Sequence, residues 1–176
     1  MIARSRQLKK ELRKCFTIGF VFISVFGTLL HFLYKWMGAN PIVGLFSPVN
    51  ESIWEHMKLF FFPMLLFTVI MSYFNILQTH YPALVPALLI GLLSGTWFIP
   101  VTYYTYSGIL GRNITWIDVL LFYLAVLFGL RTAYSRTQNC KLQKYEIPLK
   151  ICTMIMLILF MLFSQFSPGW GMFQAE

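Results

Sequence analysis

Charged residues are scarce in this chain. Only 11% of its 176 residues are charged, against about a quarter in an ordinary soluble domain. Residues 59–111 contain no Lys, Arg, Asp or Glu at all. Together with a hydrophobic share of 58%, this excludes a disordered chain and a freestanding nucleic-acid-binding domain, so no nucleic-acid partner is expected. The composition predicts an all-α integral membrane protein whose main partner is the lipid bilayer.

Cysteines are few, and the familiar catalytic motifs are missing. The three cysteines form no CxxC pair and have no metal-ligand spacing, so we assign them no role in a disulfide or a metal site. The sequence has no Gly-rich phosphate loop, no GxSxG, no HExxH and no dinucleotide-binding fingerprint. The motifs therefore leave open whether the protein is an enzyme.

The hydrophobic runs predict a single transmembrane domain of about five helices, each needing roughly 20 residues to cross a bilayer. The predicted spans cover residues 15–34, 48–78, 83–101, 116–130 and 151–166. The second span is expected to begin at Ser47 and Pro48, because Ser caps helices and Pro suits the first helical position. It is expected to kink at Pro63. A polar loop is expected at residues 102–115.

The distribution of Lys and Arg predicts how the chain lies in the membrane. Six of these residues fall within residues 4–14 and five within 131–150, whereas the opposite side has only Lys35, Lys58 and Arg112. Because Lys and Arg are retained in the cytoplasm, the amino terminus should lie inside and the carboxyl terminus outside. All five tryptophans are expected at the outer interface: Trp36, Trp54, Trp97, Trp116 and Trp170.

The most polar segment comprises residues 47–58, SPVNESIWEHMK. On one continuous helix Glu51, Glu55 and Lys58 fall within about 60° of arc, with His56 on the neighbouring stripe. Two carboxylates beside an imidazole can bind a divalent metal, move a proton or hold a cationic group. We therefore take Glu51, Glu55 and His56 as the candidate metal ligands.

Three ligands on one helix seldom complete a site, so other segments must contribute. Ionisable groups at membrane depth are costly and usually face a protein cavity, which predicts an outward-facing pocket. The candidate ligand-binding residues are His31, Asn50, Glu51, Trp54, Glu55, His56, Lys58, Arg112 and Asp118, with Lys35, Tyr103, Tyr104 and Tyr106 as further contributors.

A purely structural interpretation explains part of the same pattern. Acidic residues stabilise the first turns of any helix. Trp54 would then be an interfacial anchor, and Lys58 would extend to the interface or pair with Glu51 or Glu55. Elsewhere, Gly91 and Gly95 form a GxxxG motif that serves either packing within the monomer or a homodimer.

The segment GLFSPVNESIWEHMKLFFFP, residues 44–63, together with the earlier HFLY, residues 31–34, resembles the signature of a bacterial family of small multispan membrane proteins of unknown function. The resemblance implies a bacterial inner-membrane protein. It also implies that the polar residues of the signature form a unit, namely His31, Asn50, Glu51, Trp54, Glu55, His56 and Lys58. It implies no activity.

Three functions remain open from the sequence. The first is binding or transport of a small cationic or amphipathic solute in an outward-facing carboxylate and histidine pocket. The second is a membrane-embedded enzyme, with a divalent metal as one option, that acts on a lipid at the outer leaflet. The third is an accessory membrane subunit.

Overall fold

The computed structural model describes residues 2–174, and this part of the chain contains helices and no strand. The long helices are α1 (Ile2–Trp36), α3 (Ile53–Ser72), α5 (Leu84–Leu110), α6 (Thr115–Arg136) and α7 (Glu146–Gln165). The short ones are α2 (Pro41–Gly44), α4 (Asn75–His80) and the 3-10 turns η1 (Cys140–Tyr145) and η2 (Gly171–Phe173). Five helices are long and apolar enough to cross a membrane, which confirms the predicted all-α membrane bundle.

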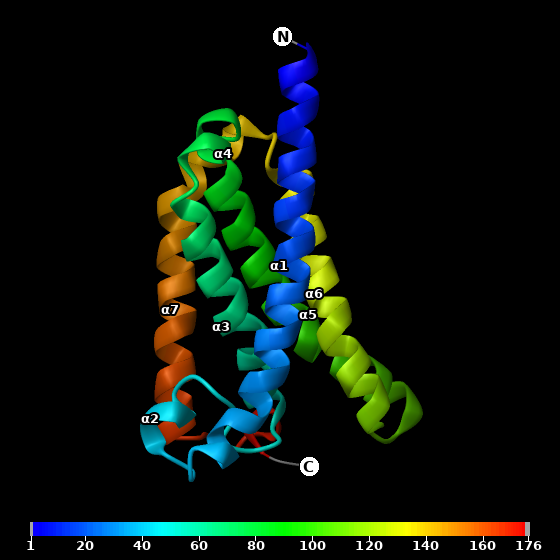
Figure 1. Cartoon of the computed structure of the whole chain (residues 1–176). Coiled ribbons are helices and arrows are strands. Elements are labelled where there is room, and N and C mark those ends of the chain that lie inside the picture. The colour runs from blue at the N-terminus through cyan, green and yellow to red at the C-terminus, as the bar shows by residue number, and fades with distance from the viewer. Residues whose placement is uncertain (1, 175–176) are drawn as a thin grey trace.

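The short elements gather at the two ends of the bundle (Figure 1). α4 and η1 lie at the end nearer the amino terminus, whereas α2, η2 and the turn between α5 and α6 lie at the opposite end. α1 has 35 residues and is therefore about 52 Å long, so it extends beyond a hydrocarbon core of about 30 Å. Towards the α2 end, the paired helices α5 and α6 diverge from the rest of the bundle as an arm (Figure 1).

α3 forms the centre of the core and packs against α1, α5, α6 and α7. The side chains of Met57, Phe60, Phe61 and Met64 are completely buried. These four residues lie on one face of α3, because they are three or four positions apart, and the buried Leu59 and Pro63 lie on the opposite side, so this part of the helix is covered on several sides. The sequence of a helix enclosed in this way is apolar on all sides and shows no amphipathic stripe.

Small residues bring α5 and α6 into backbone contact. A Cβ atom on Gly91 would lie 2.4 Å from the carbonyl oxygen of Gly129, and one on Gly95 would lie 2.4 Å from the Phe60 ring. The same ring would be 2.7 Å from a Cβ on Gly129, so Phe60 fills a notch between the two helices. The GxxxG motif therefore serves packing within the chain, and the surface expected for a homodimer through Gly91 and Gly95 is already covered by α6 and α3.

Pro63 removes a backbone donor from the middle of α3. Without an N–H at Pro63, the carbonyl oxygen of Leu59 loses its usual partner four residues ahead. Gly27 of α1 lies directly against this oxygen, since a Cβ there would come within 2.5 Å of it. The missing side chain thus lets the α1 backbone approach the carbonyl that Pro63 leaves free.

Several boundaries differ from those expected from the sequence. α3 begins at Ile53, not at Ser47 and Pro48. It ends at Ser72, so the predicted second span is interrupted before α4 begins. α5 continues to Leu110, so most of the loop expected at residues 102–115 is helical. Trp97 consequently lies near the middle of α5 and not at the end of a span. The polar Thr and Tyr residues that suggested a loop are instead accommodated in the last turns of a helix.

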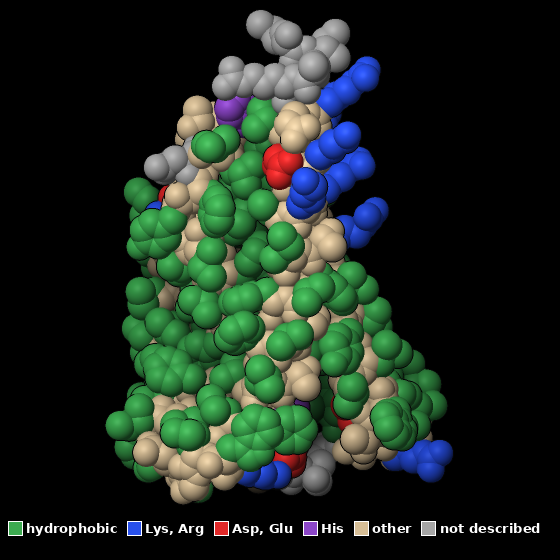
Figure 2. Space-filling model, viewed as in Figure 1, with side chains coloured by type: hydrophobic (Ala, Val, Ile, Leu, Met, Phe, Trp, Pro, Cys, Tyr) green, Lys and Arg blue, Asp and Glu red, His purple; other side chains and the backbone are tan. Residues whose placement is uncertain are grey.

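Hydrophobic side chains cover the middle of the molecule, as Figure 2 shows for one face. On α7, Ile151, Ile155 and Ile158 are each more than half exposed. In the same view Lys and Arg side chains gather along the projecting end of α1. An apolar middle between more polar ends is the surface that a membrane-spanning bundle requires.

Candidate functional site

The segment between α1 and α3 reverses the chain in a tight turn. Gly38 and Ala39 both adopt left-handed backbone angles, with φ of 64° and 58°. Asn40 then caps α2, because its side-chain oxygen accepts a hydrogen bond of 2.9 Å from the backbone N–H of Ile42. This reversal brings residues 45–52 back beside the last turns of α1, where His31 and Lys35 lie.

A second local motif places Glu51 just before α3. The Asn50 side chain accepts a 3.0 Å hydrogen bond from the Ser52 N–H, and the Ser52 hydroxyl accepts one of 3.4 Å from the Glu55 N–H. Ser52 is therefore the N-cap. Glu51 precedes the helix, so the 60° arc predicted for Glu51, Glu55 and Lys58 does not exist. The two carboxylates lie in different environments.

Glu51 meets two histidines from separate helices. His31 lies on α1, Glu51 just before α3, and His56 on α3. One ligand atom from each of them lies within 4.8 Å of those from the other two. We call these three residues the triad. His56 Nε2 is 3.4 Å from Glu51 Oε2, and the rings of His31 and His56 are 5.5 Å apart. A tetrahedral zinc ion with bonds of about 2.0–2.1 Å holds its ligands about 3.4 Å apart, so the spacing of Glu51 and His56 suits one.

Hydrogen bonding sets the tautomer of His56. Its Nδ1 lies 2.9 Å from the carbonyl oxygen of Ser52, which can only accept, so Nδ1 carries the hydrogen. In the neutral ring, Nε2 then presents a lone pair towards the Glu51 carboxylate. Two lone pairs at this distance repel each other unless a cation, either a proton or a metal ion, lies between them. Such a backbone bond on the other ring nitrogen is typical of metal-binding histidines.

The triad lies near the surface, at the α2 end of the bundle. The side chain of Glu51 is 54% exposed and that of His56 is 29% exposed. His31 is partly buried, and its Nδ1 is enclosed without a hydrogen-bond partner. Figure 2 shows a narrow opening between α1 and the α5–α6 arm at this end, with a histidine side chain visible inside. Water and ions can therefore reach the group.

Lys35 places a cation beside the triad. Its ammonium lies 3.7 Å from Glu51 Oε1, and its side chain is 76% exposed. An exposed pair of this kind contributes little to stability. The ammonium can therefore leave Glu51 at small cost when a metal ion approaches.

Glu55 and Lys58 form a separate, buried network. Their side chains are 3% and 0% exposed, with Lys58 Nζ 2.7 Å from Glu55 Oε2. Lys58 also donates to the Gly44 and Ser47 carbonyl oxygens at 3.0 and 3.5 Å. The pairing of Lys58 with Glu55 is thus confirmed, whereas its extension to the interface is wrong. Glu55 is held by Lys58 and is not one of the triad ligands.

The buried pair ties the loop before α3 to α7. Glu55 Oε2 accepts a 2.9 Å hydrogen bond from the Val49 N–H, and Glu55 Oε1 accepts one of 3.2 Å from the Ser164 hydroxyl. Lys58 also contacts Ser164. Sequence reasoning missed Ser164, because a single serine near the end of an apolar span carries no distinguishing signal.

Trp54 lies in the core, not at the interface. It is 4% exposed, and its ring packs against Phe160 at 4.7 Å and Phe173 at 4.9 Å. The predicted interfacial anchor is therefore wrong for this residue. Trp97 lies near the middle of α5. Trp54 and Trp97 are therefore not part of the tryptophan belt expected on the outer side.

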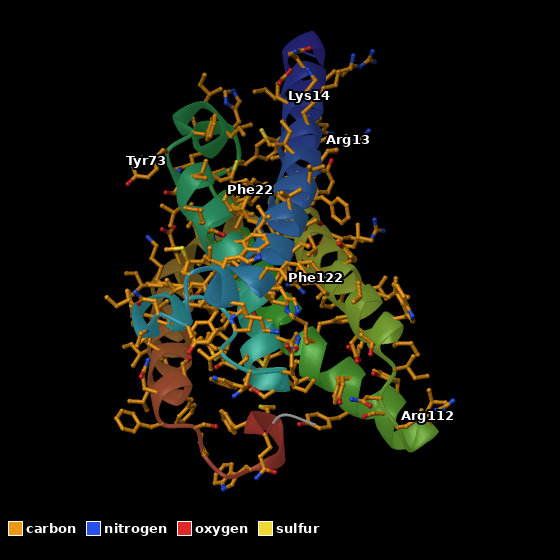
Figure 3. The ribbon with its side chains drawn as sticks, turned by 60° about the horizontal axis from the view of Figure 1, so that its bottom comes forward. Arg13, Lys14, Phe22, Tyr73, Arg112 and Phe122 are labelled. Atoms are coloured by element: carbon orange, nitrogen blue, oxygen red, sulfur yellow. The ribbon has the colours of Figure 1, made fainter. Side chains whose placement is uncertain are left out.

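Asp118 and Arg112 belong to the α5–α6 arm. Asp118 accepts a hydrogen bond from the Tyr106 hydroxyl, which links the two helices of the arm. Arg112 lies at the tip of the arm, away from the bundle (Figure 3). Neither contributes to the triad, so the convergence predicted for these residues around Glu51, Glu55 and His56 is not found. The acid is instead paired within its own arm.

Comparison with known proteins places the chain in a family without assigning it an activity. No curated protein matches it significantly, and neither does any solved structure. Residues 4–176 match a family of unknown function, DUF6512. The predicted relationship to an uncharacterised family is therefore confirmed, and the chain belongs to the DUF6512 family.

Proposed function

We propose that this membrane protein binds a divalent transition-metal ion, zinc or a zinc-like ion, through His31, Glu51 and His56. The observation that carries the proposal is the meeting of their ligand atoms within 4.8 Å. Two imidazoles and one carboxylate are the ligand set of a class of catalytic zinc sites. A metal ion is also a small cation, so this function is the specific form of the cation binding expected from the sequence.

The triad favours transition metals over magnesium or calcium. Imidazole suits zinc, copper, iron and nickel, whereas magnesium and calcium prefer oxygen ligands. The three residues come from two helices and the loop between them, and each segment is held by its own hydrogen bonds. Such a site is largely formed before the metal binds, which reduces the cost of ordering it.

Metal content of the purified protein tests this proposal. Wild-type protein dialysed against zinc should retain about one ion per chain, and His56→Ala and Glu51→Gln should each lose it. His80→Ala is the matched control, because His80 lies in α4 at the opposite end of the bundle. Equal zinc retention by wild type and His56→Ala would contradict the proposal.

A metal-dependent enzyme acting on a lipid at the outer leaflet is the second candidate. It is favoured by the number of ligands, because three protein ligands leave one tetrahedral position for water or substrate. Zinc bound in this way lowers the pKa of its water to near neutrality. Turnover of a lipid ester by the zinc-loaded protein, lost in His56→Ala, would establish this activity.

The location of the site is part of the same proposal. We place the protein in the bacterial inner membrane because residues 31–34 and 44–63 resemble the signature of a bacterial membrane-protein family. We place the triad on the outer side because of the Lys and Arg distribution.

A further inference from the structure

We infer that the open position of the metal ion at the triad takes a phosphate oxygen from an anionic lipid headgroup. The inference rests on the proposed metal site and names the class of ligand that completes it. Two observations support it: the charge balance and the aromatic surface beside Lys35.

The charge balance favours an anion. A divalent ion contributes two positive charges, Glu51 subtracts one, and the histidines bind as neutral rings. Lys35, whose ammonium is 3.7 Å from Glu51, adds one more, so the loaded site carries a net charge of about +2. When the metal ion binds the Glu51 carboxylate, the ammonium of Lys35 becomes free to pair with another anion. A phosphate group with an oxygen bound to the metal ion supplies negative charge to both the metal ion and Lys35.

The surroundings favour a lipid as the source of this anion. Phe32 and Trp36 stack on the surface of α1 with ring centroids 5.7 Å apart, and they are 43% and 65% exposed. They flank Lys35 in the last turns of the helix. Aromatic rings beside a basic residue at a helix end are typical of the headgroup region of a membrane. A free phosphate ion would gain nothing from these rings.

Zinc affinity in defined bilayers tests the inference. Wild-type protein is reconstituted in nanodiscs of phosphatidylcholine, or of phosphatidylcholine mixed with phosphatidylglycerol. A metal-binding dye then reports the zinc affinity in each. Because a ligand that prefers the loaded protein must also tighten metal binding, the anionic bilayer should raise zinc affinity about tenfold. No difference between the two bilayers would overturn the inference.

Two variants separate coordination from a general attraction of zinc to an anionic surface. Lys35→Gln should bind zinc more tightly than wild type in phosphatidylcholine, because a positive charge is removed, and should gain clearly less from phosphatidylglycerol. Arg112→Gln, at the distant tip of the arm, should gain as much as wild type. An equal gain in all three proteins would show surface accumulation only and would contradict the inference.

Three outcomes distinguish the lipid ligand from the metal site. Inorganic phosphate added to the phosphatidylcholine sample should change zinc affinity little, and a tenfold rise there would replace the lipid by free phosphate and overturn the inference. Absence of zinc binding in either bilayer would overturn the proposed function itself. If zinc binds equally well in both bilayers, the proposed metal site stands and only the lipid ligand is contradicted.

Discussion

At the scale of single residues, two neighbouring acids have different tasks. Glu51 is half exposed and faces His56, whereas Glu55 is buried and faces Lys58. The difference arises because α3 begins at Ile53, so Glu51 is directed by the preceding turn and Glu55 by the helix. One acid is available to a ligand from solution, and the other holds the loop in place.

The buried pair makes Lys58 important for stability. Lys58→Met leaves the Glu55 carboxylate buried without its cation, and it deprives the Gly44 carbonyl oxygen of its 3.0 Å donor. Breaking a buried pair from one side typically costs about 3–5 kcal/mol. We expect a clear fall in the melting temperature in detergent. Lys35→Met removes an exposed lysine from a nearby helix end and should have little effect.

The double variant Lys58→Met with Glu55→Gln checks the reason for that loss. If stranding of the carboxylate is the cause, the double variant should be more stable than Lys58→Met alone. A double variant that loses the sum of both single effects would show that the two residues act independently.

At the scale of helices, the glycines of α5 set how closely α6 and α3 approach. A Cβ atom on Gly95 would meet Phe60 at 2.4 Å, whereas Gly108 in the same helix has no atom within 4 Å of that position. Gly95→Ala should therefore cost about 1–3 kcal/mol through overpacking. Gly108→Ala should be neutral or stabilising by up to about 1 kcal/mol, because Ala favours the helix. Melting curves of the two variants compare these expectations directly, and equal stability would contradict the packing account.

The helices could largely be predicted from the sequence, but the site only in part. Hydropathy identifies apolar helices well, because the bilayer permits few alternatives. The start of α3 cannot be predicted from the sequence, since Ser47–Pro48 and Ser52 are both plausible caps and only packing decides between them. Lys58 resembles a surface lysine in sequence, and its complete burial depends on carbonyl oxygens from a loop eleven to fourteen residues away. The sequence predicts His31 as a contributor, but its closeness to Glu51 depends on the turn at Gly38.

At the scale of the whole molecule, the two ends of the bundle differ in chemistry. η1 lies at the end with the projecting, basic part of α1, and η2 lies at the end with the triad (Figure 1). A membrane therefore separates these two ends if α1, α3, α5, α6 and α7 all span it. From the distribution of basic residues we propose that the η1 end faces the cytoplasm.

Reporter fusions at Asn139 and Gln174 test this orientation. A reporter that works only in the cytoplasm should be active at Asn139, next to η1, and inactive at Gln174, next to η2. A reporter that requires the outer side should give the reverse pattern. Cytoplasmic activity at both positions would contradict the five-span arrangement.

X-ray absorption at the zinc edge is the measurement that tests the metal site most directly. For zinc-loaded wild-type protein we expect nitrogen and oxygen ligands at about 2.0–2.2 Å, with the outer-shell scattering of two imidazoles and no sulfur. In His56→Ala the zinc should be lost or the scattering of one imidazole should disappear. A sulfur shell, or a spectrum that is unchanged in His56→Ala, would contradict the assignment of His31, Glu51 and His56 as the metal ligands.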